Sequence, residues 1–429
     1  MSSRVTILLL LVGCAKRTPP VAAPEEAPPE ATLADVPAPE NPSDAPAELP
    51  LVERPLLLWR VTKDDKVSHL MGTCHLPLPL TDFIPDPTII DQARVTMVEV
   101  DMATVHPVDA LRLIWSEGSV YERMGRERFA ELSRTVGPTL PAPLLDRMKD
   151  WAIVGAAAIQ SVQPLSQPFD GTHPPLDQAV SQRAKEAGVP VRTVETLQEQ
   201  GDMMEALDLD ITEETTAEDE EAAAKVVDDM ARLCLRGDLS GAASFTVEAS
   251  PMNAQIFEAR NLAWYPTVAE EVAQGGAFIA VGAGHMAGET GLVQQLKADG
   301  YEVERLSGEV REHPLPDNAA VPDPPEGLVS EADMENLLNG TAKVLCADDQ
   351  LTRQCLAPDA AVCDAQVRSG LMHCVDQSVT QLTEMARFTD PMAAQQLVGC
   401  ALSAMVSEAL VKDSLPDTPL CASMRPPAP

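Results

Sequence analysis

Two histidines occur in the same four-residue pattern, each directly after an apolar segment that is typical of a β-strand. The first pattern is Gly72-Thr73-Cys74-His75, and the second is Gly282-Ala283-Gly284-His285. Glycine allows tight turns and close approach of the backbone, and the carboxyl ends of strands are where α/β folds bind ligands. Because neutral imidazole suits zinc, iron, cobalt and manganese, we expect His75 and His285 to share one metal site.

Acidic residues at predicted strand ends are candidates for the carboxylate of such a site. Glu99 lies between Val98 and Val100, and a carboxylate in an apolar segment is costly to bury unless it is paired or bound to a metal. Glu99 is therefore the first candidate for a third ligand, or for a general base that takes a proton from water at the metal. Glu195 is a second candidate, whereas Asp101 fits a helix cap or an ion pair better.

Arg260 and Asn261 lie early in a predicted helix. Arginine stabilises developing negative charge and orients carboxylates, so Arg260 is a catalytic candidate, with a surface ion pair as the alternative. Asp177 is expected to cap a helix that begins at Gln178. The glycines from Gly282 to Gly288 are similar to a dinucleotide-binding loop, but no second βαβ unit follows them. Nucleotide binding is therefore not expected.

The segments that must position these side chains alternate between strand-like and helix-like patterns. Strand patterns occur at Leu56–Thr62, Lys66–Met71, Val95–Val100, Val189–Val194, Gly276–Val281 and Tyr301–Leu306. Helical periodicity occurs at Asp86–Arg94, His106–Trp115, Gly125–Val136, Pro143–Ala158, Leu176–Ala187, Ala222–Arg236 and Asn253–Gln274. This alternation indicates an α/β architecture, with Asp64 and Asp65 in the turn between the first two strands.

The amino terminus, residues 1–14, has the pattern of an export signal, with a short apolar run at Val5–Val12. A cysteine after a small residue is typical of a bacterial lipoprotein, in which the lipidated Cys14 becomes the first mature residue. An ordinary secretory signal with an incidental cysteine is the alternative. Ala15 follows, and the usual sorting pattern then points to the outer membrane, facing the periplasm. Residues 15–54 are rich in proline, alanine and glutamate and are expected to form a disordered tether.

A second proline-rich segment, residues 308–328, precedes a small α-helical module at residues 329–429. Its helical patterns lie at Ala332–Val344, Asp359–Cys374 and Pro391–Val411. It contains six of the nine cysteines, namely Cys346, Cys355, Cys363, Cys374, Cys400 and Cys421. An even number of cysteines in a short exported module predicts a disulfide framework of three bridges. A metal cluster is the alternative, although no C-x-x-C pair occurs. Cys74 and Cys234 are then either free thiols or one further pair.

The balance of charges excludes some classes of function. The chain has 429 residues, with 31 Lys+Arg against 66 Asp+Glu and a formal net charge of −35. Nucleic-acid phosphates and anionic membrane surfaces both attract basic faces. We therefore expect no nucleic-acid partner and no polybasic contact with a membrane. Hydrophobic residues make up 45% of the chain, which is enough for a sizeable core.

The motifs occur in the order seen in the TraB/GumN family, which includes the TIKI proteases. The resemblance covers about residues 56 to 306 and rests on the two G-x-x-H tetrads, Val98-Glu99-Val100-Asp101, Leu176-Asp177-Gln178-Ala179, Val194-Glu195-Thr196, Arg260-Asn261 and Gly282–Gly288. TIKI-type members are described as metal-dependent proteases that use manganese or cobalt, which implies His75, His285 and Glu99 as essential residues. The family shares its core with ChaN-like and erythromycin-esterase-like proteins. This implies a mixed central β-sheet flanked by helices over residues 55–307.

Together these expectations describe a lipid-anchored protein of the bacterial cell envelope with a metal-dependent hydrolase domain, a peptidase acting on peptides or proteins of the envelope. Its cofactor would be a divalent metal ion: manganese, cobalt or zinc. His75, His285 and Glu99 would bind this ion, while Arg260 or Glu195 would stabilise developing charge. Two alternatives stay open. One is a non-catalytic lipoprotein that binds a partner through the cysteine-rich tail, and the other is a heme- or iron-handling protein of the ChaN type.

Overall fold

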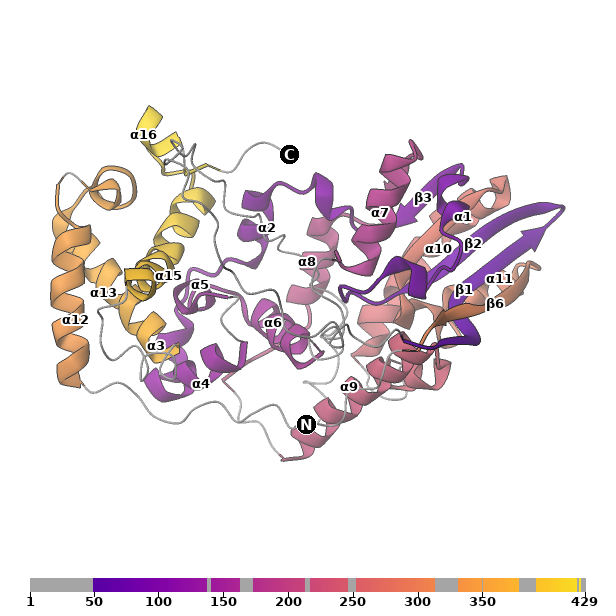
Figure 1. The fold of residues 1–429 in the computed structure, drawn as a ribbon, viewed down its shortest axis with the longest axis horizontal. Coiled ribbons are helices and arrows are strands. Elements are labelled where there is room, and N and C mark those ends of the chain that lie inside the picture. Colours follow the sequence, from indigo (N-terminus) through magenta and orange to yellow (C-terminus); the bar gives the residue numbers. More distant parts are fainter. Residues whose placement is uncertain are drawn as a thin grey trace, which may run out of the picture.

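The computed structural model describes residues 49–136, 140–162, 173–212, 217–245, 252–312, 331–348, 350–377, 391–422 and 424–425 (Figure 1). The signal segment with Cys14, almost all of the proposed tether and most of the proline-rich linker lie outside the described residues. In Figure 1 the strands gather at one end of the molecule, and the C-terminal helices, coloured orange to yellow, lie at the other.

A six-stranded mixed sheet forms the core of the α/β domain. Across the sheet its strands are β4 (Val191–Thr193), β3 (Val95–Val98), β5 (Ala277–Gly282), β2 (Lys66–Thr73), β1 (Leu51–Lys63) and β6 (Glu302–Arg311). The first four of these are parallel, whereas β1 is antiparallel to both β2 and β6. Every residue of β5 is buried, as expected for a central parallel strand covered on both faces. The mixed sheet with flanking helices confirms the predicted fold class.

The antiparallel part of the sheet begins with a tight hairpin. Asp64 and Asp65 have φ values of 51° and 60°, the left-handed values that a two-residue type I′ turn needs. The turn lies where the sequence predicts it. Strand β1 is longer than predicted, because its first residues pair with β6 from Leu51 opposite Arg311 onward. The last residues of the segment expected as tether therefore belong to the sheet.

Helices pack against the sheet and extend away from it. Of these, α7 (Leu176–Glu186) packs on β3 and β5, and α10 (Arg260–Gln274) packs on β2 and β5. The other α-helices of the domain are α1 (Thr88–Asp91), α2 (Pro107–Ile114), α3 (Val120–Met124), α4 (Arg126–Val136), α5 (Ala142–Leu145), α6 (Asp150–Val162), α8 (Leu197–Glu205), α9 (Ala217–Arg236) and α11 (Leu292–Ala298).

Two predicted helices are divided in the structure. The segment expected as one helix from Pro143 to Ala158 forms α5 and α6, because the chain between them pairs with the end of α2. There the backbone N–H of Lys149 donates to the carbonyl oxygen of Ile114 at 2.8 Å. The segment expected from Asn253 onward begins with a π-helical turn at Ala254–Ala259, and α10 follows it. Such turns often lie at functional sites, and this one places Arg260 at the start of α10.

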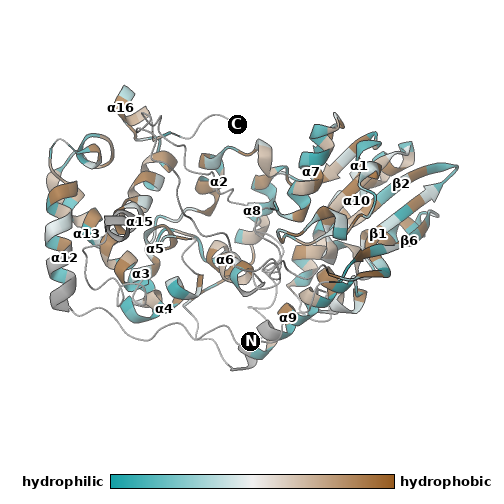
Figure 2. Cartoon of the chain, viewed as in Figure 1, coloured by the Kyte–Doolittle hydropathy of each residue, from teal (hydrophilic) through white to brown (hydrophobic). Residues whose placement is uncertain are grey.

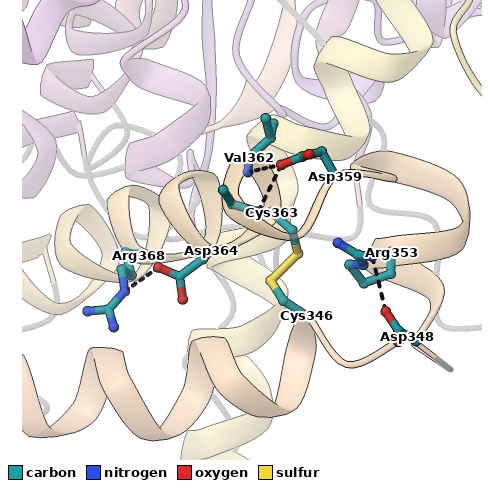
Figure 3. Close-up of a disulfide and its surroundings, with 9 residues drawn as sticks. Cys346, Asp348, Arg353, Asp359, Val362, Cys363, Asp364 and Arg368 are labelled. Carbon is teal, nitrogen blue, oxygen red and sulfur yellow. Dashed lines mark hydrogen bonds and ion pairs between the residues drawn. A yellow bond between two sulfur atoms is a disulfide. The ribbon is translucent and has the colours of Figure 1, made fainter.

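The C-terminal module consists of helices joined by disulfide bonds. Its helices are α12 (Glu331–Leu345), α13 (Ala360–Gln377), α15 (Pro391–Val411) and α16 (Pro419–Ala422). Three bridges are present, as predicted: Cys346–Cys363, Cys355–Cys421 and Cys374–Cys400. Figure 3 shows the first of them beside Asp359, whose Oδ1 accepts from the backbone N–H of Val362 at 3.0 Å and so caps α13.

The module packs on the helical part of the α/β domain. Arg126 donates two hydrogen bonds to the buried carboxylate of Asp376, at 2.7 and 2.8 Å. Arg112 donates to the carbonyl oxygen of Val411 at 3.1 Å. Hydrophobic residues line α6 and α15 in Figure 2; buried residues of α6 belong to the core of the α/β domain, whereas those of α15 belong to separate cores of the module.

The disulfide bonds indicate the kind of compartment in which the protein is found. Four disulfides join described cysteines, and such bonds persist in oxidising, extracytoplasmic compartments. None of the helices in the described ranges is long and apolar enough to cross a bilayer.

Candidate functional site

The ends of three neighbouring parallel strands bring the predicted site residues together. Glu99 follows β3 directly, His75 lies two residues beyond β2, and His285 lies in the 3-10 turn Ala283–Met286 after β5. Strands β2 and β3 each pair with β5 in parallel, so all three residues lie at the same edge of the sheet. The strand expected to run to Val100 ends before Glu99. This residue therefore lies just past the strand, where its carboxylate reaches the backbone of β5.

Gly282 is the point at which these three side chains meet. Its backbone N–H donates to Oε1 of Glu99 at 2.6 Å. A Cβ atom at this position would lie 3.1 Å from Oε1 of Glu99, 3.5 Å from Nε2 of His75 and 3.5 Å from Cδ2 of His285. Only glycine leaves this space open. The glycine of the second tetrad thus makes room for the functional groups.

Arg260 lies among the buried carboxylates and is not a surface residue. Its Nη2 donates to Oε2 of Glu99 at 2.8 Å and to Oε1 of Glu195 at 2.5 Å, and its Nε donates to Oε2 of Glu195 at 3.1 Å. The guanidinium also stacks on the Trp264 ring, with 4.4 Å between its central carbon and the ring centroid. Arg260 is 5% exposed, so the alternative of a surface ion pair is wrong.

His285 is held in one tautomer by its two neighbours. Its Nδ1 lies 2.8 Å from Oδ1 of Asn261, and its Nε2 lies 3.2 Å from Nη1 of Arg260. The amide oxygen only accepts and the guanidinium only donates. Nδ1 therefore carries the proton, and Nε2 presents a lone pair toward Arg260 and Glu99.

Asp177 lies beside His75 at a longer distance. Its Nδ1 lies 3.4 Å from Oδ1 of Asp177, while its Nε2 is buried without a hydrogen-bond partner among the described residues. Burial opposes protonation of His75, but the carboxylates of Asp177 and Glu99 together outweigh it and raise the pKa of the imidazole. The expectation that Asp177 caps a helix is wrong. Because Pro175 precedes the first turn, α7 begins at Leu176 without a side-chain cap, and the carboxylate of Asp177 faces His75.

Burial and charge set the protonation states of the cluster. Burial by itself raises the pKa of Glu99, but Arg260, the two histidines and the N–H of Gly282 outweigh it and lower that pKa to about 2. Burial and the negative charge of Glu99 raise the pKa of Glu195, and they outweigh the lowering by Arg260. Burial and Arg260 together lower the pKa of His285 to about 3. At neutral pH Glu99 is therefore ionised and His285 is neutral, and Glu195 takes up a proton more readily than Glu99.

Three side chains around Gly282 carry donor atoms of the types that bind divalent metal ions. Nε2 of His75 has no partner, Nε2 of His285 carries a lone pair, and Glu99 is ionised. An oxygen of Asn261 lies 2.8 Å from the other ring nitrogen of His285, and an oxygen of Asp177 lies 3.4 Å from that of His75; such oxygens are typical neighbours of metal-binding histidines. Within the described ranges, however, no group of three or more His, Cys, Asp or Glu side chains is arranged so that it could hold a metal ion. Arg260 bonds to both Glu99 and His285, so an ion that binds both must displace the guanidinium from at least one of them.

A disulfide lies directly beside His75. Cys74, the residue before it, is bonded to Cys234 of α9, so these two cysteines are a pair and not free thiols. Both are at most 1% exposed. The bridge fixes the loop that carries His75 to a helix far away in the sequence.

The remaining sequence candidate lies apart from the cluster. Oδ1 of Asp101 accepts from the hydroxyl of Ser181 at 2.9 Å, and Oδ2 lies 2.6 Å from Nζ of Lys185. This confirms Asp101 as an ion-pair acceptor. The supporting roles of Asp177 and Asn261 are not predicted from the sequence. The position of Asn261 directly after Arg260 is the one signal that could have suggested its role.

Comparison with known proteins agrees with this geometry. A model of the TraB/PrgY/gumN family matches residues 57–305, which is more than half of the chain and includes every residue of the cluster. No curated protein and no solved structure matched the chain. The chain therefore belongs to the TraB/PrgY/gumN family.

Proposed function

We propose that the chain is a metal-dependent hydrolase, and more narrowly a peptidase of the bacterial cell envelope. The observation that carries the proposal is the meeting of His75, Glu99 and His285 around the position that a Cβ atom on residue 282 would occupy. Membership of the family supports it, because TIKI-type members are described as metal-dependent proteases. The substrate class is peptide or protein of the envelope.

The proposed cofactor is manganese, cobalt or zinc. Nε2 of His75, Nε2 of His285 and the carboxylate of Glu99 would hold the ion. When bound there, it supplies Lewis-acid polarisation of a carbonyl and activation of water. The two supporting oxygens, on Asp177 and Asn261, keep the imidazoles turned toward it.

The other side chains of the cluster bind, orient and transfer protons. Arg260 holds Glu99 and Glu195 in place, and its charge stabilises an oxyanion that develops nearby. Glu195 has a raised pKa, so its carboxyl group accepts a proton during attack and returns it to the leaving amine.

The direction of substrate approach follows from exposure. The side chains of His75 and Asp177 are 10% and 15% exposed, whereas those of Arg260 and Glu99 are 6% and 7% exposed. The side chains beside His75 are thus slightly more exposed than those around Arg260. We propose that the substrate enters beside His75 and that Arg260 lies behind the reacting group, where water is excluded.

The proposed location is the outer membrane, with a lipid on Cys14 and the domains facing the periplasm. Disulfides typical of an oxidising compartment support the location. Metabolic labelling with a palmitate analogue tests the anchor: label in the wild-type chain that is lost in Cys14→Ser supports it, and equal label in both contradicts it.

Cleavage of a peptide mixture by the full chain tests the activity. The protein is stripped of metal with a chelator and supplied with manganese, cobalt or zinc, and new termini are identified by mass spectrometry. We expect cleavage that needs the added ion and that disappears in Glu99→Gln. Glu304→Gln changes an exposed glutamate of β6 and should cleave like wild type. No cleavage with any of the three ions, or equal cleavage by Glu99→Gln, would count against the proposal.

A further inference from the structure

A cavity of about 200 Å³ lies where the C-terminal module meets the α/β domain. Residues of α5 and the turn that follows it line one side, and α13 and α15 line the other. Its polar lining residues are Asp146, Arg147, Gln366, Ser369, His373 and Glu408. None of these residues belongs to the cluster around Arg260, so any ligand here is separate from the proposed metal site.

His373 is an unsatisfied polar side chain in this cavity. It is 3% exposed, and neither ring nitrogen has a hydrogen-bond partner among the described residues. The rings of Tyr121 and Phe129 lie against it, with centroids 4.6 and 4.9 Å away, and hold it in place. Burial lowers its pKa, so the ring is neutral and offers one lone pair and one N–H. A buried polar group without a partner costs about 1–3 kcal/mol, which a bonded ligand would recover.

Of the other polar lining residues, Gln366, Asp146 and Glu408 offer acceptor oxygens, whereas Arg147 contributes a cation. Oε1 of Gln366 is buried and has no partner within the described ranges. Oδ1 of Asp146 accepts from the hydroxyl of Ser119 at 2.7 Å, whereas Oδ2 lies 3.9 Å from Nε of Arg147, beyond hydrogen-bond distance. Arg147 instead donates through Nη1 to the carbonyl oxygen of Glu117 at 3.1 Å. The nearest cation thus leaves one oxygen of Asp146 available.

The rest of the lining combines a second carboxylate with small apolar groups. Glu408 is partly exposed, and its Oε1 accepts from Nζ of Lys412 at 2.8 Å. The apolar residues are Pro143, Ala365, Ala401, Ala404 and Met405. A matching ligand has a cationic end with several N–H donors and a short apolar end.

We propose that this cavity binds a primary ammonium group carried on a short alkyl chain. An ammonium has three N–H donors, which match Oε1 of Gln366, Oδ2 of Asp146 and the lone pair of His373. Its charge complements the carboxylates of Asp146 and Glu408, and the chain packs against Met405. A free alkylamine and the lysine side chain of a peptide share this chemistry.

The position of the cavity links binding to the docking of the module. Asp146 belongs to the α/β domain, whereas His373 and Glu408 belong to α13 and α15 of the module. A ligand that contacts both parts binds the docked arrangement better than the separated one, so it stabilises docking by mass action. The module would then sense amines in the compartment around the protein.

A titration of the full chain with ethylammonium chloride tests the proposal. The protein is labelled with ¹³C at the methionine methyl groups, and the Met405 signal is identified with Met405→Leu. Ethylammonium should shift this signal saturably, whereas tetramethylammonium, which has the charge but no N–H donor, should not. A parallel titration with N-acetyl-lysine methylamide separates the two sources. Tighter binding than ethylammonium supports a peptide lysine, and weaker binding supports a free amine.

Variants of the lining complete the test. Gln366→Leu removes an acceptor from the cavity and Glu408→Gln removes a negative charge, and each should raise the Kd for ethylammonium about tenfold. Glu335→Gln is the matched control, because Glu335 likewise bonds within its own helix, to Asn339 at 3.0 Å, but lies outside the cavity. Its Kd should equal that of wild type. The proposal is overturned if Met405 does not respond, responds equally to tetramethylammonium, or responds equally in Glu408→Gln and Glu335→Gln.

Discussion

Replacement of Arg260 by methionine tests the buried charge cluster directly. The Arg260 side chain makes four hydrogen bonds to three partners, Glu99, Glu195 and His285. Methionine is unbranched and uncharged, so the two carboxylates would stay buried without their counter-charge. Removal of one partner from a buried ion pair costs about 3–5 kcal/mol. We expect the free energy of unfolding at pH 7 to fall by about that amount.

The pH dependence of the free energy of unfolding tests the same substitution in a second way. In the wild type the pKa of Glu99 is lowered from its ordinary value of 4.5 to about 2, which corresponds to about 3 kcal/mol of stability. A lowered carboxyl pKa stabilises the fold above pH 4.5, and this contribution is lost as the pH falls toward 2. The raised pKa of Glu195 acts in the opposite sense, since its contribution is lost as the pH rises. Without Arg260 both carboxylates take up protons more readily. The stability that Arg260→Met loses relative to the wild type should therefore be smaller at pH 5 than at pH 7.

Urea unfolding followed by tryptophan fluorescence measures both effects. Arg192→Met is the matched control, because Arg192 pairs with the buried Glu271 but has a largely exposed side chain, and Arg94 still pairs with Glu271 when it is removed. Exposed pairs contribute about 0–1 kcal/mol, so the control should lose little. The reasoning is refuted if Arg260→Met loses no more than Arg192→Met, or if its loss is the same at pH 5 and pH 7.

Three further changes test the supports of the site. Asp177→Asn should weaken Mn²⁺ binding about 10- to 100-fold, because it loosens the orientation of His75; equilibrium dialysis measures this, and unchanged affinity would contradict it. Gly282→Ala should lower the free energy of unfolding by about 1–3 kcal/mol, since its Cβ would lie 3.1 Å from Oε1 of Glu99; a urea midpoint equal to wild type would count against this. Serine at both Cys74 and Cys234 should destabilise the fold by about 2–5 kcal/mol, because their bond spans 160 residues of sequence; differential scanning calorimetry checks this, and an unchanged Tm would exclude it.

The edge of the sheet that carries the site is predictable because local patterns mark it. His75, Glu99 and His285 each come soon after a short apolar segment, and parallel strands end at one edge. The order of the motifs also identifies the family, and the family in turn predicts the mixed sheet. The hairpin at Asp64 and Asp65 is predictable for the same reason, since a two-residue turn depends on its own residues.

The supports of the site are not predictable because they depend on contacts between distant segments. Asp177 faces His75 only because α7 packs on β3 and β5, and the local sequence around Asp177 fits a helix cap equally well. Glu195 and Glu99 both bind Arg260 because β4 pairs with β3. No local sequence pattern predicts this strand pairing. The bond between Cys74 and Cys234 likewise joins segments that are distant in the sequence, and so do the disulfide pairings within the module. No local pattern predicts which cysteines pair.

The central claim is that His75, His285 and Glu99 hold one divalent ion. Equilibrium dialysis of the full chain against MnCl₂, with the bound metal determined by mass spectrometry, tests it most directly. We expect one Mn²⁺ per chain in the wild type, loss of this ion in His75→Ala, and retention in His69→Ala, which changes a histidine of β2 outside the cluster. No bound ion in the wild type, or equal binding by wild type and His75→Ala, would contradict the claim.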